Sequence, residues 1–308
     1  MSDLALSAAY DQIVAARTSP ETRPCVRSFF DETTFTATHV VHDPRTRAAA
    51  IIDSVMNYEP ASGRTSFHSA EQVVAYVRHE QLNVVWQLET HAHADHLSAA
   101  PWLKQQLGGR IGIGSDIVQV QQTFGAIFNA EPGFTRDGAQ FDHLFTDGET
   151  FSLGDLPAIA LHVPGHTPAD MAFIIGDAAF IGDTLFMPDY GTARADFPGG
   201  SARTLYHSIR RLLSLPPQTR LFLCHDYKAP GRDQFAWETT VAAERENNIH
   251  VHDGISEDAF VSMRTARDAT LSLPNLIMPS VQVNMRAGHL PPPENNGISY
   301  IKIPVNTL

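Results

Sequence analysis

Cysteine is scarce in this sequence, and its scarcity excludes several kinds of fold and metal site. The 308 residues contain two cysteines, Cys25 and Cys224, too few for a disulfide framework or for a zinc finger built on thiolates. No segment approaches the roughly 20 consecutive apolar residues that span a bilayer, and residues 1–24 contain no apolar run of signal-peptide length. We therefore expect a cytoplasmic protein in a reducing compartment, without a membrane partner.

Basic residues are also few. There are 22 Lys and Arg residues against 34 Asp and Glu residues, which gives a formal net charge of −12, and no cluster of Lys or Arg stands out. A surface of this sign repels the phosphates of nucleic acids, so we expect no nucleic-acid partner. Hydrophobic residues make up 43% of the chain and charged residues 18%, which is typical of a globular protein with a sizeable core.

Short apolar and β-branched segments predict a series of strands. Three of them, at residues 26–30, 36–42 and 48–53, are separated by turn residues and predict an antiparallel meander. The other predicted strands are residues 82–88, 151–163, 171–175, 178–180 and 221–224. Apolar residues at helical spacing predict helices at residues 69–81, 97–107, 202–215, 235–248 and 256–270.

Strands followed by helices, twice over, predict an α+β fold. Together with the motifs described next, they favour a four-layered αββα sandwich with a helical C-terminal extension. We expect residues 1–24 to form an N-terminal arm and residues 25–233 to form the catalytic core. Residues 234–308 are expected to form the extension, packed on the same core.

The densest group of potential metal ligands lies in THAHADHLSAA, residues 90–100, where six residues hold three histidines and an aspartate. This segment follows the strand predicted at residues 82–88, so its side chains project from a loop between two rigid elements. Imidazole and carboxylate groups suit zinc, iron or manganese. Alternate residues of an extended segment point the same way, so we expect His91 and His93 to approach one ion, and Asp95 and His96 to face a neighbouring one.

Three further candidate ligands lie just past apolar strands. They are His166 in VPGHTPAD, Asp183 in FIGDTLF and His225 in FLCHDYK. Taken alone, such residues are more often surface histidines or turn aspartates. At the edge of one sheet, however, they can gather over the 91–96 loop and complete a metal site. Asp53, which follows the apolar run AAAII, is expected to brace that loop.

The series THAHADH, PGHT, GDTLF and a histidine at a strand end resembles the motif series of the metallo-β-lactamase fold. The resemblance extends from about residue 26 to residue 227 and implies the αββα sandwich. It does not imply one reaction, because lactamases, glyoxalase II thioesterases, lactonases, nucleases and oxygen-using enzymes share these motifs.

Segments outside these motifs resemble the persulfide dioxygenases. They are SVMNYEPASGRTS (residues 54–66), MPDYGTARADFPGG (187–200), SARTLYHSI (201–209), LCHDY (223–227) and PSVQVNMRAGHLPPPENNG (279–297). The resemblance implies one Fe(II) per subunit on His91, His166 and Asp183, a two-histidine, one-carboxylate face with open positions. It also implies oxidation of glutathione persulfide by O2 to sulfite and glutathione, and a homodimer.

That scheme leaves four candidate ligands over: His93, Asp95, His96 and His225. They are expected either to support the first ligands by hydrogen bonds or to hold a second metal. The alternative function is therefore a dinuclear hydrolase of the glyoxalase II type, in which two zinc ions serve the cleavage of a thioester. A sensor of metal or persulfide would need a DNA-binding module, and none is evident.

Three residues are candidates for binding the substrate. Arg194 lies in the ARADF segment and Tyr227 ends the LCHDY segment. Arg286, in VQVNMRAG, is a candidate for binding a glutathione carboxylate through two hydrogen bonds. The alternative for Arg194 is a structural salt bridge with Asp196 or Asp189, and the alternative for Arg286 is a surface position.

Overall fold

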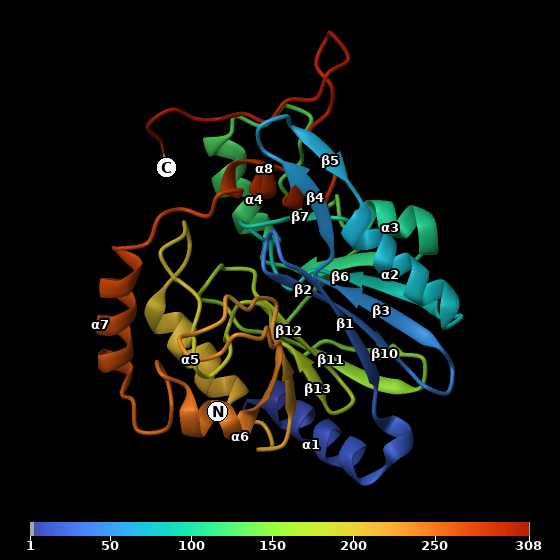
Figure 1. Ribbon diagram of the computed structural model, residues 1–308, viewed down its shortest axis with the longest axis vertical. Helices are drawn as coiled ribbons and strands as arrows, with labels where there is room; N and C mark the ends of the chain where they lie inside the picture. The colour runs from blue at the N-terminus through green and yellow to red at the C-terminus, as the bar shows by residue number, and fades with distance from the viewer. Residues whose placement is uncertain (1–2, 308) are drawn as a thin grey trace.

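Two six-stranded sheets lie face to face at the centre of the protein (Figure 1). The structure is a computed structural model and describes residues 3–307. The first sheet has the order β1-β2-β3-β6-β8-β9. Its strands are β1 (Cys25–Asp31), β2 (Thr36–His42), β3 (Ala48–Ile52), β6 (Asn83–Leu88), β8 (Arg110–Gly114) and β9 (His143–Phe145).

The second sheet has the order β10-β11-β12-β13-β14-β15, and a third, small sheet has the order β5-β4-β7. The strands of the second sheet are β10 (Thr150–Leu153), β11 (Leu156–His162), β12 (Met171–Ile175), β13 (Ala178–Phe180), β14 (Arg220–Phe222) and β15 (Glu238–Thr240). Those of the small sheet are β4 (Val55–Glu59), β5 (Arg64–Ser66) and β7 (Leu97–Ser98).

The predicted antiparallel meander is confirmed at one edge of the first sheet. β1 pairs with β2 and β2 with β3, both antiparallel. β2 and β3 are buried along their whole length, because other layers cover both faces of the sheet. β3 and β6 then pair in parallel, so their carboxyl ends lie side by side. Asp53 follows the first of these ends, and the loop of residues 90–96 follows the second.

The segment 151–163, predicted as one strand, is a hairpin of β10 and β11. The turn begins at Gly154, whose φ of +63° favours glycine. Leu153 and Leu156 flank the turn and are both buried, so the apolar pattern continues through the break and hides it. The strands predicted at residues 171–175 and 178–180 are confirmed by β12 and β13.

Apolar side chains from both large sheets fill the space between them. This cluster includes Ile52 and Leu88 from the first sheet and Phe173, Phe180 and Phe222 from the second. Two further clusters join each sheet to helices on its outer face, with α2 and α3 on the first sheet and α1 and α5 on the second. Figure 1 shows these layers, and the predicted αββα sandwich is confirmed.

The five predicted helices are present, and α1, α4 and α8 were not predicted. Their bounds are α1 (Leu4–Thr18), α2 (His68–His79), α3 (Ala100–Leu107), α4 (Ile117–Ile127), α5 (Ala202–Leu212), α6 (Val241–Asn247), α7 (Glu257–Asp268) and α8 (Ile277–Asn284), and a 3-10 turn spans Pro20–Thr22. Two predicted helices begin later than expected. The helix predicted from residue 97 begins at Ala100, because β7 pairs with β4. The helix predicted from residue 235 begins at Val241, because β15 extends the second sheet.

An N-terminal helix and the helices of the C-terminal extension pack against the core. The segment predicted as an N-terminal arm contains α1, whose Ala9 and Ile13 are fully buried on the second sheet. In the C-terminal extension, α7 lies against α5, and α8 lies against α4 and β7. Among residues 3–307, no helix combines the length and the apolar character needed to cross a membrane.

Glu244, on α6, carries a carboxyl group that is buried in the folded protein. Burial raises its pKa from the ordinary 4.5 to about 8, and one of its oxygens accepts a hydrogen bond from the Asn248 amide at 2.7 Å. Between about pH 4.5 and about pH 8, the Glu244 carboxyl therefore keeps its proton in the folded protein and has lost it in the unfolded chain. The free energy of unfolding must then fall as the pH rises between these two pKa values.

We expect Glu244→Gln, which mimics the protonated carboxyl, to be as stable as the wild type near about pH 5 and more stable by about 1–3 kcal/mol near about pH 8. Urea unfolding at the two pH values measures the difference. The same difference at both pH values would contradict the assignment of this proton to Glu244.

Candidate metal centre

The seven candidate ligands gather at the carboxyl ends of β3 and β6 and form two groups. The first group is His91, His166 and Asp183, and the second is His93, Asp95, His96 and His225. Within each group the ligand atoms lie within 4.8 Å of one another. Asp183 faces both groups: its Oδ2 lies 3.8 Å from His91 Nε2 and 3.6 Å from His166 Nε2, and its Oδ1 lies 3.5 Å from His225 Nε2.

His93 lies between the two groups. Its ring centre is 4.0 Å from that of His91 and 4.1 Å from that of His96, and its ligand atom belongs to the second group. Residues 91–96 form bends and not an extended strand. The alternation expected to aim His91 and His93 at one ion therefore does not hold in this loop.

The histidines outside the loop each have one ring nitrogen engaged by the protein. His166 Nδ1 donates a hydrogen bond to the carbonyl oxygen of Arg194 at 2.8 Å. His225 Nδ1 lies 3.1 Å from the carbonyl oxygen of Phe35. Such contacts fix the orientation and tautomer of metal-binding histidines. The other nitrogen of each ring, Nε2, is left to face Asp183 and the site.

Several buried ligand atoms have no hydrogen-bond partner among residues 3–307. They include His91 Nε2, His93 Nδ1, His96 Nε2 and Asp183 Oδ1. A buried polar atom without a partner costs about 1–3 kcal/mol, so four of them in one place indicate a site for a shared ligand. Imidazole nitrogens and carboxylate oxygens are donors for divalent zinc, iron and manganese. The residues present therefore fit the metal ions that the sequence predicts.

Burial keeps two of these histidines in the neutral form that metal binding requires. Burial and the neighbouring rings of His93 and His166 lower the pKa of His91 well below 6.5. Burial, assisted by His93, lowers the pKa of His96 to about 4. A neutral imidazole offers a lone pair at neutral pH, so a metal ion has no proton to displace from these two rings.

Asp53 holds the ligand loop in place, as expected from the sequence. Its carboxylate accepts hydrogen bonds from the Thr90 backbone N–H at 2.8 Å, the Thr90 hydroxyl at 2.9 Å and His93 Nε2 at 3.0 Å. Burial disfavours a charged ring, but Asp53 and Glu89 together raise the pKa of His93 well above 6.5. In the metal-free protein both ring nitrogens therefore carry a proton; Asp53 accepts the one on Nε2, so Nδ1 is the nitrogen whose proton a metal ion would displace.

Asn284, the last residue of α8, holds the same loop from the C-terminal extension, and the sequence did not predict it. Its side-chain amide donates to the carbonyl oxygens of His93 at 2.9 Å and His96 at 2.8 Å. Its side-chain carbonyl accepts from the Ser98 N–H at 2.8 Å. The one signal for Asn284 in the sequence is its place in VQVNMRAG. No local pattern links residue 284 to a loop almost 200 residues earlier.

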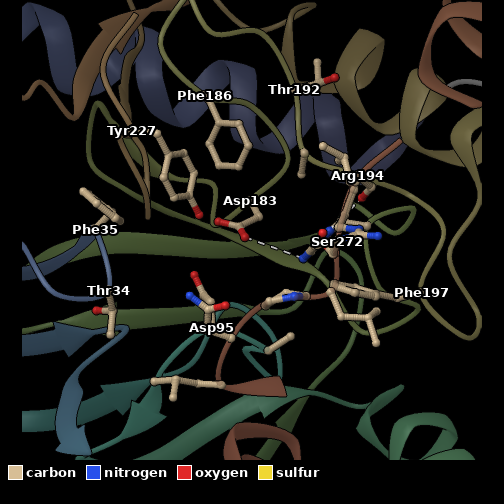
Figure 2. A pocket seen from close by; sticks show the side chains of 18 of the residues that line it. Thr34, Phe35, Asp95, Asp183, Phe186, Thr192, Arg194, Phe197, Tyr227 and Ser272 are labelled. Atoms are coloured by element: carbon tan, nitrogen blue, oxygen red, sulfur yellow. Dashed lines mark hydrogen bonds and ion pairs between the residues drawn. The ribbon is translucent and has the colours of Figure 1, made fainter. Parts of the chain in front are cut away.

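A cavity of about 410 Å³ opens over the metal ligands. Figure 2 shows Asp95 and Asp183 between Phe35 and Tyr227 on one side and Arg194 and Phe197 on the other. Phe186 and Tyr190 add further aromatic surface, and residues between 264 and 276 of the C-terminal extension line the remaining wall. A cavity of this size and lining suits a small molecule with apolar and charged parts.

Arg194 lines the cavity, but its guanidinium group is already paired. It donates to the Asp196 carboxylate at 2.6 and 2.8 Å and to the Ser272 carbonyl oxygen at 2.7 Å, and it lies over the ring of Phe197. Of the two predicted salt-bridge partners, Asp196 is the one it contacts. Arg194 therefore shapes the wall, and its backbone carbonyl orients His166.

Tyr227 also lines the cavity, and Figure 2 shows its hydroxyl directed toward Asp183. Although 36% of the residue is exposed, the hydroxyl end is the enclosed end. Burial and the carboxylates of Asp95 and Asp183 raise the pKa of Tyr227 well above 10. The hydroxyl therefore stays protonated and is available as a hydrogen-bond donor to a bound molecule.

Arg286 is not among the residues that line the cavity, although the sequence made it a candidate for binding substrate. Its guanidinium donates to Glu131 at 2.7 Å and to the Gln282 carbonyl oxygen at 2.6 Å, and it lies over the ring of Phe134. The residue is only 6% exposed. Nη1 and Nη2 bind groups of the protein, and the structure places Arg286 outside the cavity that Arg194 and Tyr227 line.

Comparison with known proteins gives relatives over most of the chain. A probable metallo-hydrolase of Burkholderia pseudomallei is 54% identical over 293 residues, which cover 92% of this chain and 99% of that protein. Glyoxylase B2 of Dictyostelium discoideum is 49% identical over 271 residues, which cover 87% of this chain and 92% of that protein. The mitochondrial persulfide dioxygenase ETHE1 of Homo sapiens is 27% identical over 266 residues, which cover 85% of this chain and 88% of that protein.

Among solved structures, ETHE1 from Myxococcus xanthus matches with a TM-score of 0.68 and 27% sequence identity, covering 86% of this chain and 100% of that one. Persulfide dioxygenases are thus similar at 27% identity, whereas the relatives at 49% and 54% carry glyoxylase and hydrolase names. The model of the metallo-beta-lactamase superfamily matches residues 36–225, from β2 to the last ligand. The chain belongs to the metallo-β-lactamase superfamily.

Proposed function

We propose that the protein is a dinuclear metallo-hydrolase of the glyoxalase II type, which cleaves thioesters of glutathione. The observation that carries this proposal is the second ligand group, in which the buried atoms His93 Nδ1 and His96 Nε2 lack hydrogen-bond partners among residues 3–307. Groups that only support a first metal are expected to be hydrogen-bonded. The hydrolase and glyoxylase names of the relatives at 54% and 49% identity also support hydrolysis.

The residues around the ligands suit the cleavage of a thioester by water. Two divalent ions in these groups would supply a deprotonated water at neutral pH and polarise the thioester carbonyl. The Tyr227 hydroxyl is placed to donate a hydrogen bond to the carbonyl oxygen as this oxygen gains charge. The aromatic walls exclude bulk water from the acyl group. The thioester and one water then give a carboxylic acid and the glutathione thiol.

Arg267, on α7, is the candidate for binding the charged end of the substrate. It lines the cavity and is exposed, and among residues 3–307 it has no ion-pair partner, whereas Arg194 and Arg264 are paired. Glutathione carries two carboxylates, and a guanidinium group binds a carboxylate through two hydrogen bonds. We expect Arg267→Gln to raise KM about tenfold and to leave kcat within about twofold.

Steady-state kinetics with a glutathione thioester measure this effect. Arg203→Gln is the matched control, because Arg203 lies on α5, pairs with Glu257 and is not among the residues that line the cavity. A tenfold fall in kcat at unchanged KM would mean that Arg267 acts on the reacting atoms or on the fold, and not on the distant end of the substrate.

Oxidation of glutathione persulfide is the second candidate. It is favoured by the position of the segments that resemble persulfide dioxygenases, since Arg194 and Phe197 of ARADF and Tyr227 of LCHDY all line the cavity. In that case one Fe(II) on His91, His166 and Asp183 would supply the oxygen chemistry, and the second ligand group would support it. The relatives that carry this name are 26–27% identical.

The two candidates differ in metal and in co-substrate, and one protein preparation tests both. Zinc-loaded protein is given a glutathione thioester and the free thiol is measured; iron-loaded protein is given glutathione persulfide, and O2 uptake and sulfite are measured. We expect thiol release with zinc. O2 uptake matched by sulfite, with no thiol release, would overturn the hydrolase in favour of the oxygenase. The homodimer and the cytoplasmic location stay predictions.

A further inference from the structure

The metal ligand His166 depends on an irregular backbone segment for its orientation. Its Nδ1 donates to the Arg194 carbonyl oxygen at 2.8 Å, and its ring packs edge-on against Phe197. Both partners belong to residues 191–197, which form no helix or strand. A ligand supported in this way is held only as firmly as the segment that supports it.

A buried ion pair on α7 holds that segment. Asp268 Oδ2 accepts a hydrogen bond from the Ala195 N–H at 3.0 Å, and Arg264 Nη1 donates to the Thr192 carbonyl oxygen at 3.0 Å. The two side chains also bind each other, since Arg264 Nε and Nη2 lie 2.9 and 2.6 Å from Asp268 Oδ1. Arg264 is 1% exposed and Asp268 5% exposed. The two contacts to backbone lie on either side of Arg194.

The presence of this buried ion pair is not explained by a gain in folding stability. Removing two charges from water costs about as much free energy as their attraction provides, and an apolar pair of similar volume is often at least as stabilising. The distinctive feature is that both side chains also hydrogen-bond the backbone of residues 191–197. Asp268 accepts from the Ala195 N–H, and Arg264 donates to the Thr192 carbonyl oxygen. The other ion pairs of α7 among residues 3–307 join Glu257 and Asp258 to Arg203 and His207; they are partly exposed and link α7 to α5 only.

We propose that Arg264 and Asp268 are positioning residues for the first metal site, acting through the Arg194 carbonyl on His166. The second ligand group is supported elsewhere: Thr36 Oγ1 of β2 lies 3.4 Å from both His96 Nδ1 and His225 Nδ1. Helix α7 therefore controls one metal site and not the other. This inference concerns the metal centre itself, so it goes beyond the proposed function and applies to either reaction.

The test is the zinc affinity of the double variant Arg264→Met/Asp268→Leu, measured by competition with a chromophoric chelator. Replacing the pair by apolar side chains removes the contacts to Thr192 and Ala195 while keeping the volume of the core. We expect one of two zinc equivalents to bind about 10–100-fold more weakly and the other to bind as in the wild type. Glu257→Gln is the matched control on α7 and should leave both equivalents unchanged.

A double-mutant cycle identifies the site that is affected. His166→Ala should weaken the same equivalent, and combining it with the α7 double variant should add little, because both act on one contact. Additive losses, equal weakening of both equivalents, or unchanged binding would each overturn the inference. Asp268→Asn, of nearly unchanged shape, should give a smaller loss at the same equivalent, and it serves if the double variant does not fold.

The proposed hydrolase can fail separately from this inference. If the wild-type protein binds a single metal equivalent, the dinuclear hydrolase is contradicted. The inference then still requires that the α7 double variant bind that one ion more weakly, since His166 belongs to the first ligand group. Unchanged binding of the single ion would overturn it.

Discussion

Replacing Asp183 with alanine is expected to lower the catalytic rate by about a thousandfold or more and to weaken metal binding in both ligand groups. Asp183 faces both groups through its carboxylate, whose oxygens lie 3.5–3.8 Å from His91, His166 and His225. Its loss removes a negative charge that would balance the positive charge of the two bound ions. Metal content by mass spectrometry and the rate of thioester hydrolysis measure the two effects.

Asp155→Ala is the matched control for Asp183. Asp155 is an exposed aspartate that pairs with Arg45, remote from the ligands, and its loss should leave metal content and rate unchanged. If Asp183→Ala retained two metal equivalents with wild-type affinity, the assignment of Asp183 to both groups would be wrong.

Asp53→Asn is expected to lower metal affinity by about 10–100-fold, although Asp53 is assigned to neither ligand group as a metal ligand. Asparagine tolerates the φ of +53° at this position, so the backbone is preserved. The change removes the charge that fixes the proton on His93 Nε2 and so aims Nδ1 at the metal. Chelator competition measures the affinity.

Asp43→Asn tests whether any buried aspartate would have the same effect. Asp43 is fully buried and accepts hydrogen bonds from Arg45, Thr46 and Asp155 in a turn that follows β2. It should alter stability and not metal affinity. Metal affinity within about twofold of the wild type for Asp53→Asn would contradict the role given to Asp53.

The candidate metal ligands, which the structure brings together, could be found in the sequence because their signals are local. Three histidines and an aspartate within six residues have few structural explanations, and the remaining ligands each stand at the end of an apolar run that predicts a buried strand. The strands themselves follow from residue type and length. Once His166, Asp183 and His225 are placed at strand ends, the order of strands in the second sheet brings them together.

The supporting contacts could not be predicted, because they join parts of the chain that share no local pattern. Asn284 binds the carbonyl oxygens of His93 and His96 across almost 200 residues, and Asp268 binds the backbone of Ala195. Asp268 lies on a predicted helix, where any polar residue has the same sequence signature, and α8, which contains Asn284, was not predicted. Arg286 illustrates the converse, since its neighbours in the sequence suggested a substrate contact and its neighbours in space are Glu131 and Phe134.

The choice between hydrolysis and oxidation rests on whether the second ligand group holds metal. The segment that contains Arg194 favours persulfide oxidation by resemblance, and the more similar relatives favour hydrolysis by name. Both proposed reactions would use the first ligand group and the same cavity. The orphaned atoms of His93 and His96 are the structural feature on which the two accounts differ.

The most direct measurement is a titration of the metal-free protein with zinc, in which thioester hydrolysis is followed at each addition. We expect activity to rise until two equivalents are bound, and His96→Ala to bind one equivalent and to hydrolyse poorly. Saturation at one equivalent without hydrolysis, together with sulfite formation by the protein loaded with one iron, would contradict the dinuclear hydrolase.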